Sequence, residues 1–134
     1  MLRPKQVKFR KYRKIRIKRT AFGLSKPKHG KYALKSLEGG QVSARQIEAL
    51  RRVITRKTKR TGKVWIRIFP NVPVTSKPTE VRMGKGKGSV TKWVAVVKPG
   101  TILYELGGVR ENLAKDALIS AGKKLGIRST FVSI

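Results

Sequence analysis

The clearest periodic pattern of apolar residues lies in the first half of the chain. Ile47, Leu50 and Ile54 recur at spacings of three and four residues. This spacing places all three side chains on one face of a helix. The pattern predicts an amphipathic helix whose apolar face packs into a core.

The ends of this helix are marked by local signals. Ser43 followed by Gln46 has the form of a capping box, in which the two side chains accept hydrogen bonds from each other's backbone N–H groups. Gly62 is expected to end the helix, because glycine readily adopts the left-handed conformation found there. We therefore expect a helix that begins after Ser43 and ends before Gly62.

A strand pattern follows directly. Residues 64–69 alternate, with one valine and two isoleucines on the same face. Pro70 and Pro73 are expected to close this strand, because proline cannot donate to a sheet ladder.

A second and more buried strand is predicted at residues 93–97. Residues 98–101 should form a tight turn, since Pro99 presets the second turn position and Gly100 permits positive φ at the third. Residues 102–106 are expected to return as the partner strand of a hairpin.

A second helix is predicted after two glycines at 107 and 108, and it should end at Gly126. Its expected buried face has a spacing of four: Val109, Leu113, Ala117, Ala121 and Leu125. A last strand follows at residues 127–134. The element order predicts an α+β domain over residues 1–134, with a mixed, mostly antiparallel sheet and two packed helices.

Charge gives the first indication of function. The 134 residues include 34 Lys and Arg against 6 Asp and Glu, a formal net charge of +28. A polyanion would relieve the resulting self-repulsion, and nucleic acid is the favoured candidate. An anionic membrane is the alternative, but the cations run along most of the chain instead of gathering on one amphipathic helix. The chain has no cysteine, and we expect no metal site, cofactor or catalytic group.

The densest positive charge lies in residues 1–20, which contain ten cations and no acid. We interpret this segment as a basic arm that orders partly on RNA, with Phe9 or Tyr12 available for stacking. A solvated tail is the alternative. The cations expected to bind RNA are Arg3, Lys5, Lys8, Arg10, Lys11, Arg13 and Lys14. Residues 21–40 are interpreted as a Gly- and Lys-rich loop, in which His29 either touches phosphate or has no special role.

The predicted first helix also has a cationic face. Arg45, Arg52, Arg56 and Lys59 project opposite the apolar face, and Glu48 is the only acid between residues 45 and 63. Solvated helix faces normally mix both signs of charge. We therefore expect this face to contact phosphates, although an ordinary solvated face remains the alternative. Two further cations complete the predicted RNA-binding set, namely Arg60 and Lys63.

A long loop is predicted over residues 76–92. Three glycines alternate with two lysines at residues 84–88, which suits close approach of the backbone to phosphates. The spacing matches neither the P-loop nor the dinucleotide fingerprint, so nucleotide hydrolysis is disfavoured.

Several segments together resemble ribosomal protein sixteen of the large subunit, of bacterial and organellar type. The most specific are KRTGKVWIRIFP (residues 59–70) and RMGKGKGSVTKW (residues 82–93). The opening MLRPKQVKFRKYRK, the helix SARQIEALRRVITRKTKR and the segment WVAVVKPGTILYELGGV resemble the family as well. The resemblance covers essentially the whole chain except residues 16–32.

The resemblance implies a non-catalytic protein that binds large-subunit rRNA near the aminoacyl-tRNA site and the peptidyl transferase centre. It further implies contact with tRNA, neighbouring ribosomal proteins as partners, a role late in subunit assembly, and no homo-oligomer. The expected location is the ribosome of a bacterium, plastid or mitochondrion. The segment implied to reach tRNA and the catalytic centre comprises Arg82, Met83, Gly84, Lys85, Gly86, Lys87 and Gly88. A free architectural RNA- or DNA-binding protein is the alternative, and an RNA-modifying enzyme is a weaker one.

Overall fold

The computed structural model describes residues 2–17, 19–21 and 25–134 and confirms the α+β class. The elements in chain order are β1 (Tyr32–Ser36), β2 (Gly40–Ser43), α1 (Ala44–Lys57), β3 (Lys63–Ile66), β4 (Val72–Ser76), β5 (Ser89–Val97), β6 (Ile102–Gly107), α2 (Glu111–Gly122) and β7 (Ser129–Ser133).

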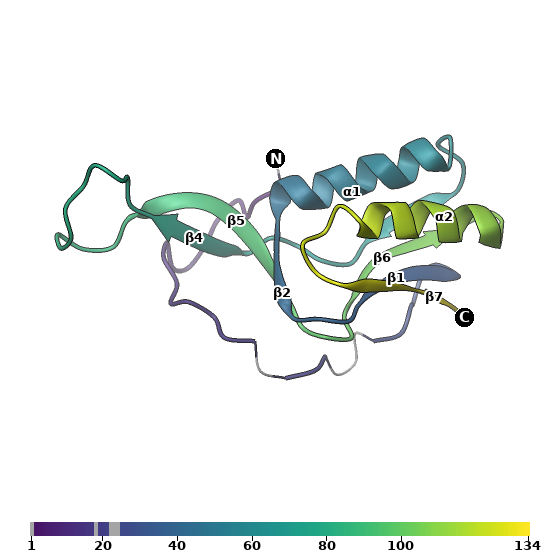
Figure 1. Ribbon diagram of the computed structural model, residues 1–134, viewed down its shortest axis with the longest axis horizontal. Helices are drawn as coiled ribbons and strands as arrows, with labels where there is room; N and C mark the ends of the chain where they lie inside the picture. Colours follow the sequence, from purple (N-terminus) through teal and green to yellow (C-terminus); the bar gives the residue numbers. More distant parts are fainter. Residues whose placement is uncertain (1, 18, 22–24) are drawn as a thin grey trace.

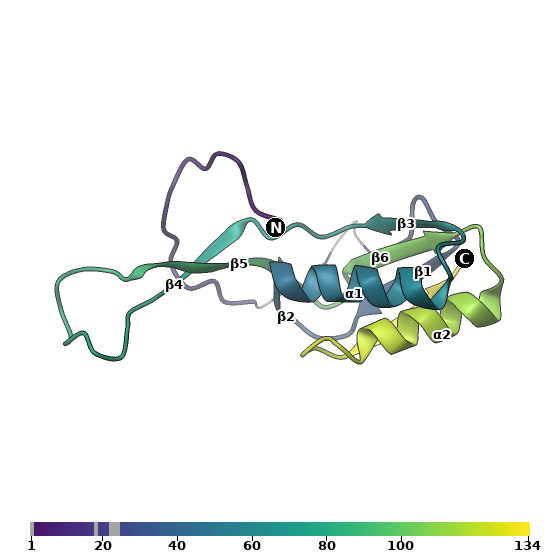
Figure 2. The same cartoon turned by 90° about the horizontal axis from the view of Figure 1, so that it is seen from above.

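The strands form two sheets instead of the one mixed sheet expected. One has the order β3-β6-β1-β7 and the other the order β2-β5-β4, and every strand pairing within them is antiparallel. The two helices pack side by side on one face of the four-stranded sheet (Figure 1). Strands β4 and β5 extend away from this layered body as a narrow two-stranded projection (Figure 2).

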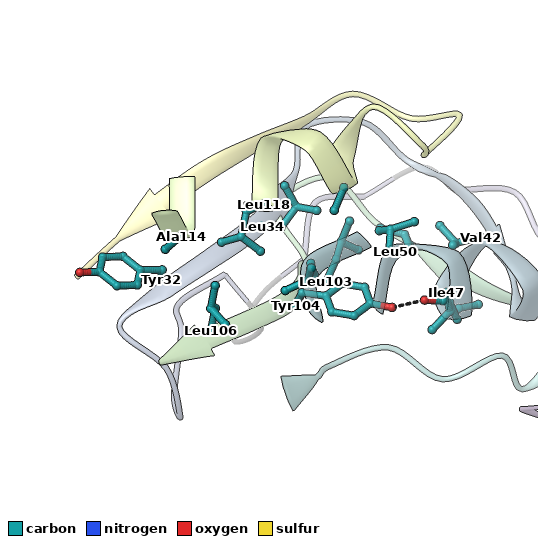
Figure 3. Packing of buried hydrophobic residues seen from close by; sticks show 14 residues of the cluster. Tyr32, Leu34, Val42, Ile47, Leu50, Leu103, Tyr104, Leu106, Ala114 and Leu118 are labelled. Atoms are coloured by element: carbon teal, nitrogen blue, oxygen red, sulfur yellow. Dashed lines mark hydrogen bonds between the residues drawn. The ribbon is translucent and has the colours of Figure 1, made fainter. Parts of the chain in front are cut away.

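The predicted apolar face of α1 is confirmed. Ile47, Leu50 and Ile54 are fully buried in a core cluster that includes side chains from both sheets and from α2 (Figure 3). The hydroxyl of Tyr104 donates a hydrogen bond of 2.5 Å to the backbone oxygen of Ile47. Burial raises the pKa of Tyr104, which keeps the phenol protonated as the donor. The helix is thus fixed to β6 by both packing and a buried hydrogen bond.

The prediction of a hairpin between residues 93–97 and 102–106 is wrong. The turn itself forms as predicted, with Gly100 at φ 89°. However, β5 and β6 belong to different sheets, and the turn carries the chain from one to the other. The end of β1 takes the place of a hairpin partner. Ser36 donates its N–H to the Thr101 oxygen at 2.9 Å and accepts from Gly100 at 2.8 Å.

Three strands were not predicted. One of them, β1, lies within residues 21–40, which were expected to be a loop; residues 22–24 of that range lie outside the described residues. The second, β2, begins at Gly40, the last residue of that range, and continues to Ser43. The third is β4, which contains Pro73, a residue expected to end a strand. The sheet order places β4 at an edge, where a missing backbone donor is tolerated.

The start of α1 is confirmed and its predicted end is wrong. Ser43 donates its backbone N–H to Gln46 Oε1 at 2.8 Å, and the Gln46 N–H donates to Ser43 Oγ at 3.3 Å. The helix ends at Lys57, five residues before Gly62. Glycine is still required at position 62, because a Cβ there would lie 2.5 Å from the backbone oxygen of Gly107.

Two cations close the helix in place of a glycine. Lys59 and Arg60 adopt left-handed φ values of 49° and 62°. The Arg60 N–H donates back to the oxygen of Thr55 at 2.9 Å, which satisfies a carbonyl of the last turn. Lys59 therefore lies beyond the end of the helix. The sequence pattern had predicted it on the cationic face of the helix, and that prediction is wrong.

The predicted buried face of the second helix is partly wrong. Leu113 is 37% exposed, and the buried residues of α2 are Ala114, Ala117, Leu118 and Ala121. A strict spacing of four precesses by about 40° per step around a helix of 3.6 residues per turn, so it cannot stay on one face. The helix ends at Gly122 and not at Gly126, whereas the last strand is confirmed as β7.

Candidate nucleic-acid interface

The basic arm has no helix or strand within its described residues, 2–17 and 19–20. Its start is tied down, because Leu2 packs against the core cluster beside α1. Phe9 and Tyr12 make an edge-to-face contact with 6.5 Å between ring centroids. All seven arm cations predicted to bind RNA are exposed. Met1 and Lys18 of the predicted arm lie outside the described residues.

The α1 cations form a shallow hollow on the protein surface. Arg45, at the start of the helix, is exposed but does not line this hollow. It lies in a separate groove beside Leu2. The hollow is lined by Arg51, Arg52, Thr55, Arg56, Lys59 and Arg60, and we call this set the α1 hollow. Although Lys59 and Arg60 follow the helix, the left-handed turn keeps both beside it. The structure thus brings four of the predicted RNA-binding cations together.

Arg51 is a member of this hollow that the sequence analysis missed. Its Nη2 lies 2.7 Å from Glu48 Oε1, and Arg52 Nε lies 3.1 Å from the same oxygen. Hydrogen bonds from Arg51 and Arg52 lower the pKa of Glu48 to about 2. The i, i+3 spacing of Glu48 and Arg51 was a signal that could have indicated this contact. Glu48 thereby orients two guanidinium groups at the edge of the hollow.

The predicted loop is shorter than expected and forms the end of the β4–β5 hairpin. Residues 89–92 belong to β5, which leaves residues 77–88 as the connection. Gly84, Lys85 and Gly86 have consecutive positive φ values of 97°, 54° and 86°. Met83 is 99% exposed, and Arg82, Lys85 and Lys87 are exposed beside it. The tip therefore presents cations and backbone without any packed support.

Gly88 has a different role from the two glycines at the tip. A Cβ at Gly88 would lie 2.3 Å from the backbone oxygen of Ser76, whereas one at Gly84 or Gly86 would meet nothing within 4 Å. Gly88 is therefore required for close approach of the two strand ends. The tip glycines are required only for the sign of φ.

The arm and the loop contact each other. Lys11 Nζ donates to the backbone oxygen of Lys87 at 3.0 Å, and Lys87 Nζ donates to the backbone oxygen of Tyr12. These partners are 75 and 76 residues apart in the chain, so no sequence pattern predicted the contact. Lys63 lies elsewhere, at the start of β3, with its Nζ 5.4 Å from the centroid of the Trp65 ring.

Glu105 is the buried acid that the sequence analysis did not single out. Its side chain is 0% exposed and pairs with Arg67. Burial raises the pKa of Glu105, but hydrogen bonds from the backbone of residues 28–30 and from Arg67 outweigh it and leave that pKa lowered. The carboxylate is therefore charged and fully paired, an arrangement that supports structure and not proton transfer.

Other site chemistries have no counterpart in the described part of the chain. Residues 2–17, 19–21 and 25–134 contain no group of three or more His, Cys, Asp or Glu side chains that could hold a metal ion. No helix in these ranges is long and apolar enough to span a bilayer.

Comparison with known proteins shows to which protein family the chain belongs. The sequence profile of the family described as ribosomal protein L16p/L10e matches residues 4–132. The chain belongs to this family. The resemblance inferred from the motifs is therefore confirmed.

Individual relatives agree over nearly the full length. The chain is 58% identical to the large ribosomal subunit protein uL16 of Mesorhizobium japonicum over 132 residues, which is 98% of this chain and 96% of the relative. It is 55% identical to the uL16 protein of Rhizobium meliloti and 52% identical to that of Francisella tularensis subsp. holarctica, each with the same coverage.

Family membership establishes the coarse function. The chain is a structural constituent of the large ribosomal subunit and acts in translation, and proteins of this family are not enzymes. The similar proteins are bacterial, which agrees with the ribosome of the bacterial cytoplasm among the expected locations. Membership of a ribosomal-protein family favours this function over the alternative of a free architectural RNA- or DNA-binding protein.

Proposed function

We propose that the chain binds large-subunit rRNA mainly through the basic arm and the α1 hollow, close to the aminoacyl-tRNA site and the peptidyl transferase centre. The tip of the β4–β5 loop contacts tRNA, and binding of the protein supports late assembly of the subunit. The protein acts as one copy, with rRNA, tRNA and neighbouring ribosomal proteins as its partners.

The α1 hollow is the observation that carries this proposal. Five cations line it, and the neighbouring acid Glu48 is already bonded to Arg51 and Arg52. Arginine guanidinium groups match phosphate oxygens in a fixed, bidentate geometry. The opposite face of the helix is buried, so the backbone that carries the helical cations is fixed before binding. This arrangement suits a phosphate backbone whose position is fixed.

The loop supports the tRNA contact in a different way. Its tip projects farthest from the layered body (Figure 2). Exposed lysines and backbone N–H groups at glycine positions can approach phosphates closely. A partner that arrives and leaves, such as tRNA, requires a contact that adapts to it. The family resemblance of RMGKGKGSVTKW supports the same role for this segment.

The first experiment compares two double variants. Arg52→Ala with Arg56→Ala removes two cations of the α1 hollow. Lys115→Ala with Lys124→Ala removes one exposed cation on α2 and one just after it. Binding of large-subunit rRNA is measured over a range of salt concentrations. We expect the arginine pair to reduce the logarithmic salt slope by about 2, since each phosphate contact contributes about 1. The lysine pair should leave the slope nearly unchanged.

Equal losses in both double variants would show that binding is unspecific and would contradict the proposal. Duplex DNA of matched length provides a second check. If the protein binds that DNA as tightly as its rRNA, the alternative of a general nucleic-acid-binding protein gains support. Thermal unfolding of both variants confirms that neither has lost its fold.

A further inference from the structure

A second surface on the four-stranded sheet combines aromatic rings with cations. Trp65 of β3 lies directly opposite Glu105 of β6 in the strand register. The neighbours of Glu105, Tyr104 and Leu106, point into the core beneath the helices. Since side chains alternate along a strand, Trp65 and Glu105 lie on the sheet face away from the helices.

Glu105 holds a chain segment against this face. Its Oε2 accepts hydrogen bonds from the backbone N–H groups of His29 at 2.6 Å and Gly30 at 2.9 Å, and the N–H of Lys28 lies 3.2 Å from both carboxylate oxygens. The segment is also pressed close, because a Cβ at Gly30 would lie 2.8 Å from the backbone oxygen of Leu106. Three successive N–H groups around one buried carboxylate leave the segment little freedom.

The fixed segment places the His29 ring on Trp65. The two ring centroids are 6.0 Å apart and the planes meet at 22°, which is a stacked arrangement. The Trp65 ring also lies close to the Cα of Gly107, where an added Cβ would be 3.2 Å from Cζ3. Trp65 is partly buried while His29 is exposed, so the pair presents an aromatic surface to solvent.

Cations surround these rings. Lys63 Nζ is 5.4 Å from the Trp65 centroid, and Lys28 and Lys31 are exposed on either side of His29 and Gly30. The acid at this place, Glu105, is buried and paired with Arg67. The surface is therefore aromatic and electropositive, and none of its residues belongs to the arm, the α1 hollow or the loop. Packing alone would account for the position of Trp65 over Gly107. It does not require the exposed ring of His29 among lysines.

We propose that Trp65 and His29 form a stacking site for one unpaired RNA base, with Lys28 and Lys63 binding the adjoining phosphates. Unpaired bases in RNA stack on aromatic side chains, and this contact tolerates any base because every base has a π-face. Glu105 acts as a positioning residue that holds His29 in the stack. The inference rests on the proposed RNA-binding function but concerns a separate surface.

Fluorescence tests the site directly. In a Trp93→Phe background, Trp65 is the remaining tryptophan, so quenching of its emission reports on this surface alone. A single-stranded oligoadenylate should quench it, and a duplex RNA of the same length should quench it much less. Equal quenching by both RNAs, or by neither, would overturn the stacking site.

Substitutions give an independent test. Trp65→Leu should weaken oligoadenylate binding roughly 5- to 100-fold, the range expected for one lost base stack, while Trp65→Phe should retain most of the affinity. Phe69→Leu is the matched control, because Phe69 is an exposed aromatic just after β3 with no stacking partner among the described residues. Loss of affinity in both Trp65 variants, with intact thermal unfolding, would count against stacking.

Salt dependence separates this inference from the proposed function. Trp65→Leu should lower affinity without changing the salt slope, because stacking releases no counterions, whereas the arginine pair in the α1 hollow should change the slope. If the arginine pair behaves as expected and Trp65→Leu has no effect, the stacking site is wrong and the proposed function stands. If neither has an effect on RNA binding, both are wrong.

Discussion

The α1 hollow and the β4–β5 loop are both rich in cations, yet they are held in opposite ways. Behind the hollow, Ile47, Leu50 and Ile54 are fully buried, and Tyr104 fixes the helix backbone. The loop tip has three consecutive residues at positive φ and a fully exposed Met83, with nothing packed beneath its glycines. A concentration of cations therefore does not by itself determine what a surface binds. A fixed phosphate pattern favours the hollow, and a partner that moves favours the loop.

The largest expected effect comes from removing the support behind the hollow. Ile47→Ala should reduce the free energy of unfolding by about 2–5 kcal/mol, because it leaves a cavity in the core. Ile54→Ala should behave alike. Chemical denaturation measures both. Ile119→Ala on α2 is the control, since that side chain is 41% exposed and should change stability by about 0.5 kcal/mol or less. Unchanged stability of Ile47→Ala would show that the core face is assigned wrongly.

The loop should show the reverse pattern. Lys85→Ala with Lys87→Ala should leave the unfolding free energy nearly unchanged, because neither side chain is buried. The pair should weaken tRNA binding to ribosomes carrying the variant and should delay late subunit maturation, as seen in subunit sedimentation profiles. Lys98→Ala, an exposed cation in the turn between the sheets, is the control. Normal tRNA binding and normal profiles would contradict a functional loop.

Replacing Lys85 and Lys87 one at a time separates contact with tRNA from contact with the arm. Lys87 also donates to the backbone of Tyr12 in the arm, whereas Lys85 has no such contact among the described residues. Lys87→Ala should therefore increase protease sensitivity of the arm in the free protein, and Lys85→Ala should not. Equal sensitivity in both would show that the contact between arm and loop does not order the arm.

The smallest effect concerns the charge at the edge of the hollow. Hydrogen bonds from Arg51 and Arg52 lower the pKa of Glu48 from its ordinary 4.5 to about 2. A lowered pKa means that the pairing stabilises the fold above pH 4.5 and that this contribution is lost as the pH falls towards 2. Titration of the Glu48 carboxyl by NMR should give a pKa near 2, and Arg51→Ala should move it towards 4.5. A pKa near 4.5 in the unsubstituted protein would show that Glu48 does not hold the arginines.

Local signals predicted local structure well. The capping box at Ser43, the buried face of α1 and the turn at Gly100 all depend on residues within a few positions of one another, and all three are confirmed. The sheet arrangement depends on distant partners. Residues 94–97 pair with β2, some fifty residues earlier in the chain, so adjacency in sequence suggested the wrong hairpin.

The candidate surfaces show the same difference between local signals, which could be predicted, and contacts between distant residues, which could not. Cations at helical spacing predicted most of the α1 hollow. The left-handed turn that places Lys59 and Arg60 beside the helix could not be predicted, because no sequence signal marks a helix end before Gly62. The Trp65 site could not be predicted, because Glu105 is satisfied chiefly by backbone N–H groups, which every sequence contains. The specific RNA contacts of both surfaces remain predictions.

The turn after α1 has a consequence for how this sequence balances stability against charge. A left-handed residue other than glycine costs about 1–2 kcal/mol, and two of them stand in succession at Lys59 and Arg60. Glycine at either position would relieve that strain and make the isolated protein more stable, but it would remove a cation from the hollow. The proposed binding of RNA to the hollow would offset this loss of folding free energy. The stability that matters for this protein is that of the assembled particle, so variants selected for a more stable free chain are expected to assemble less well.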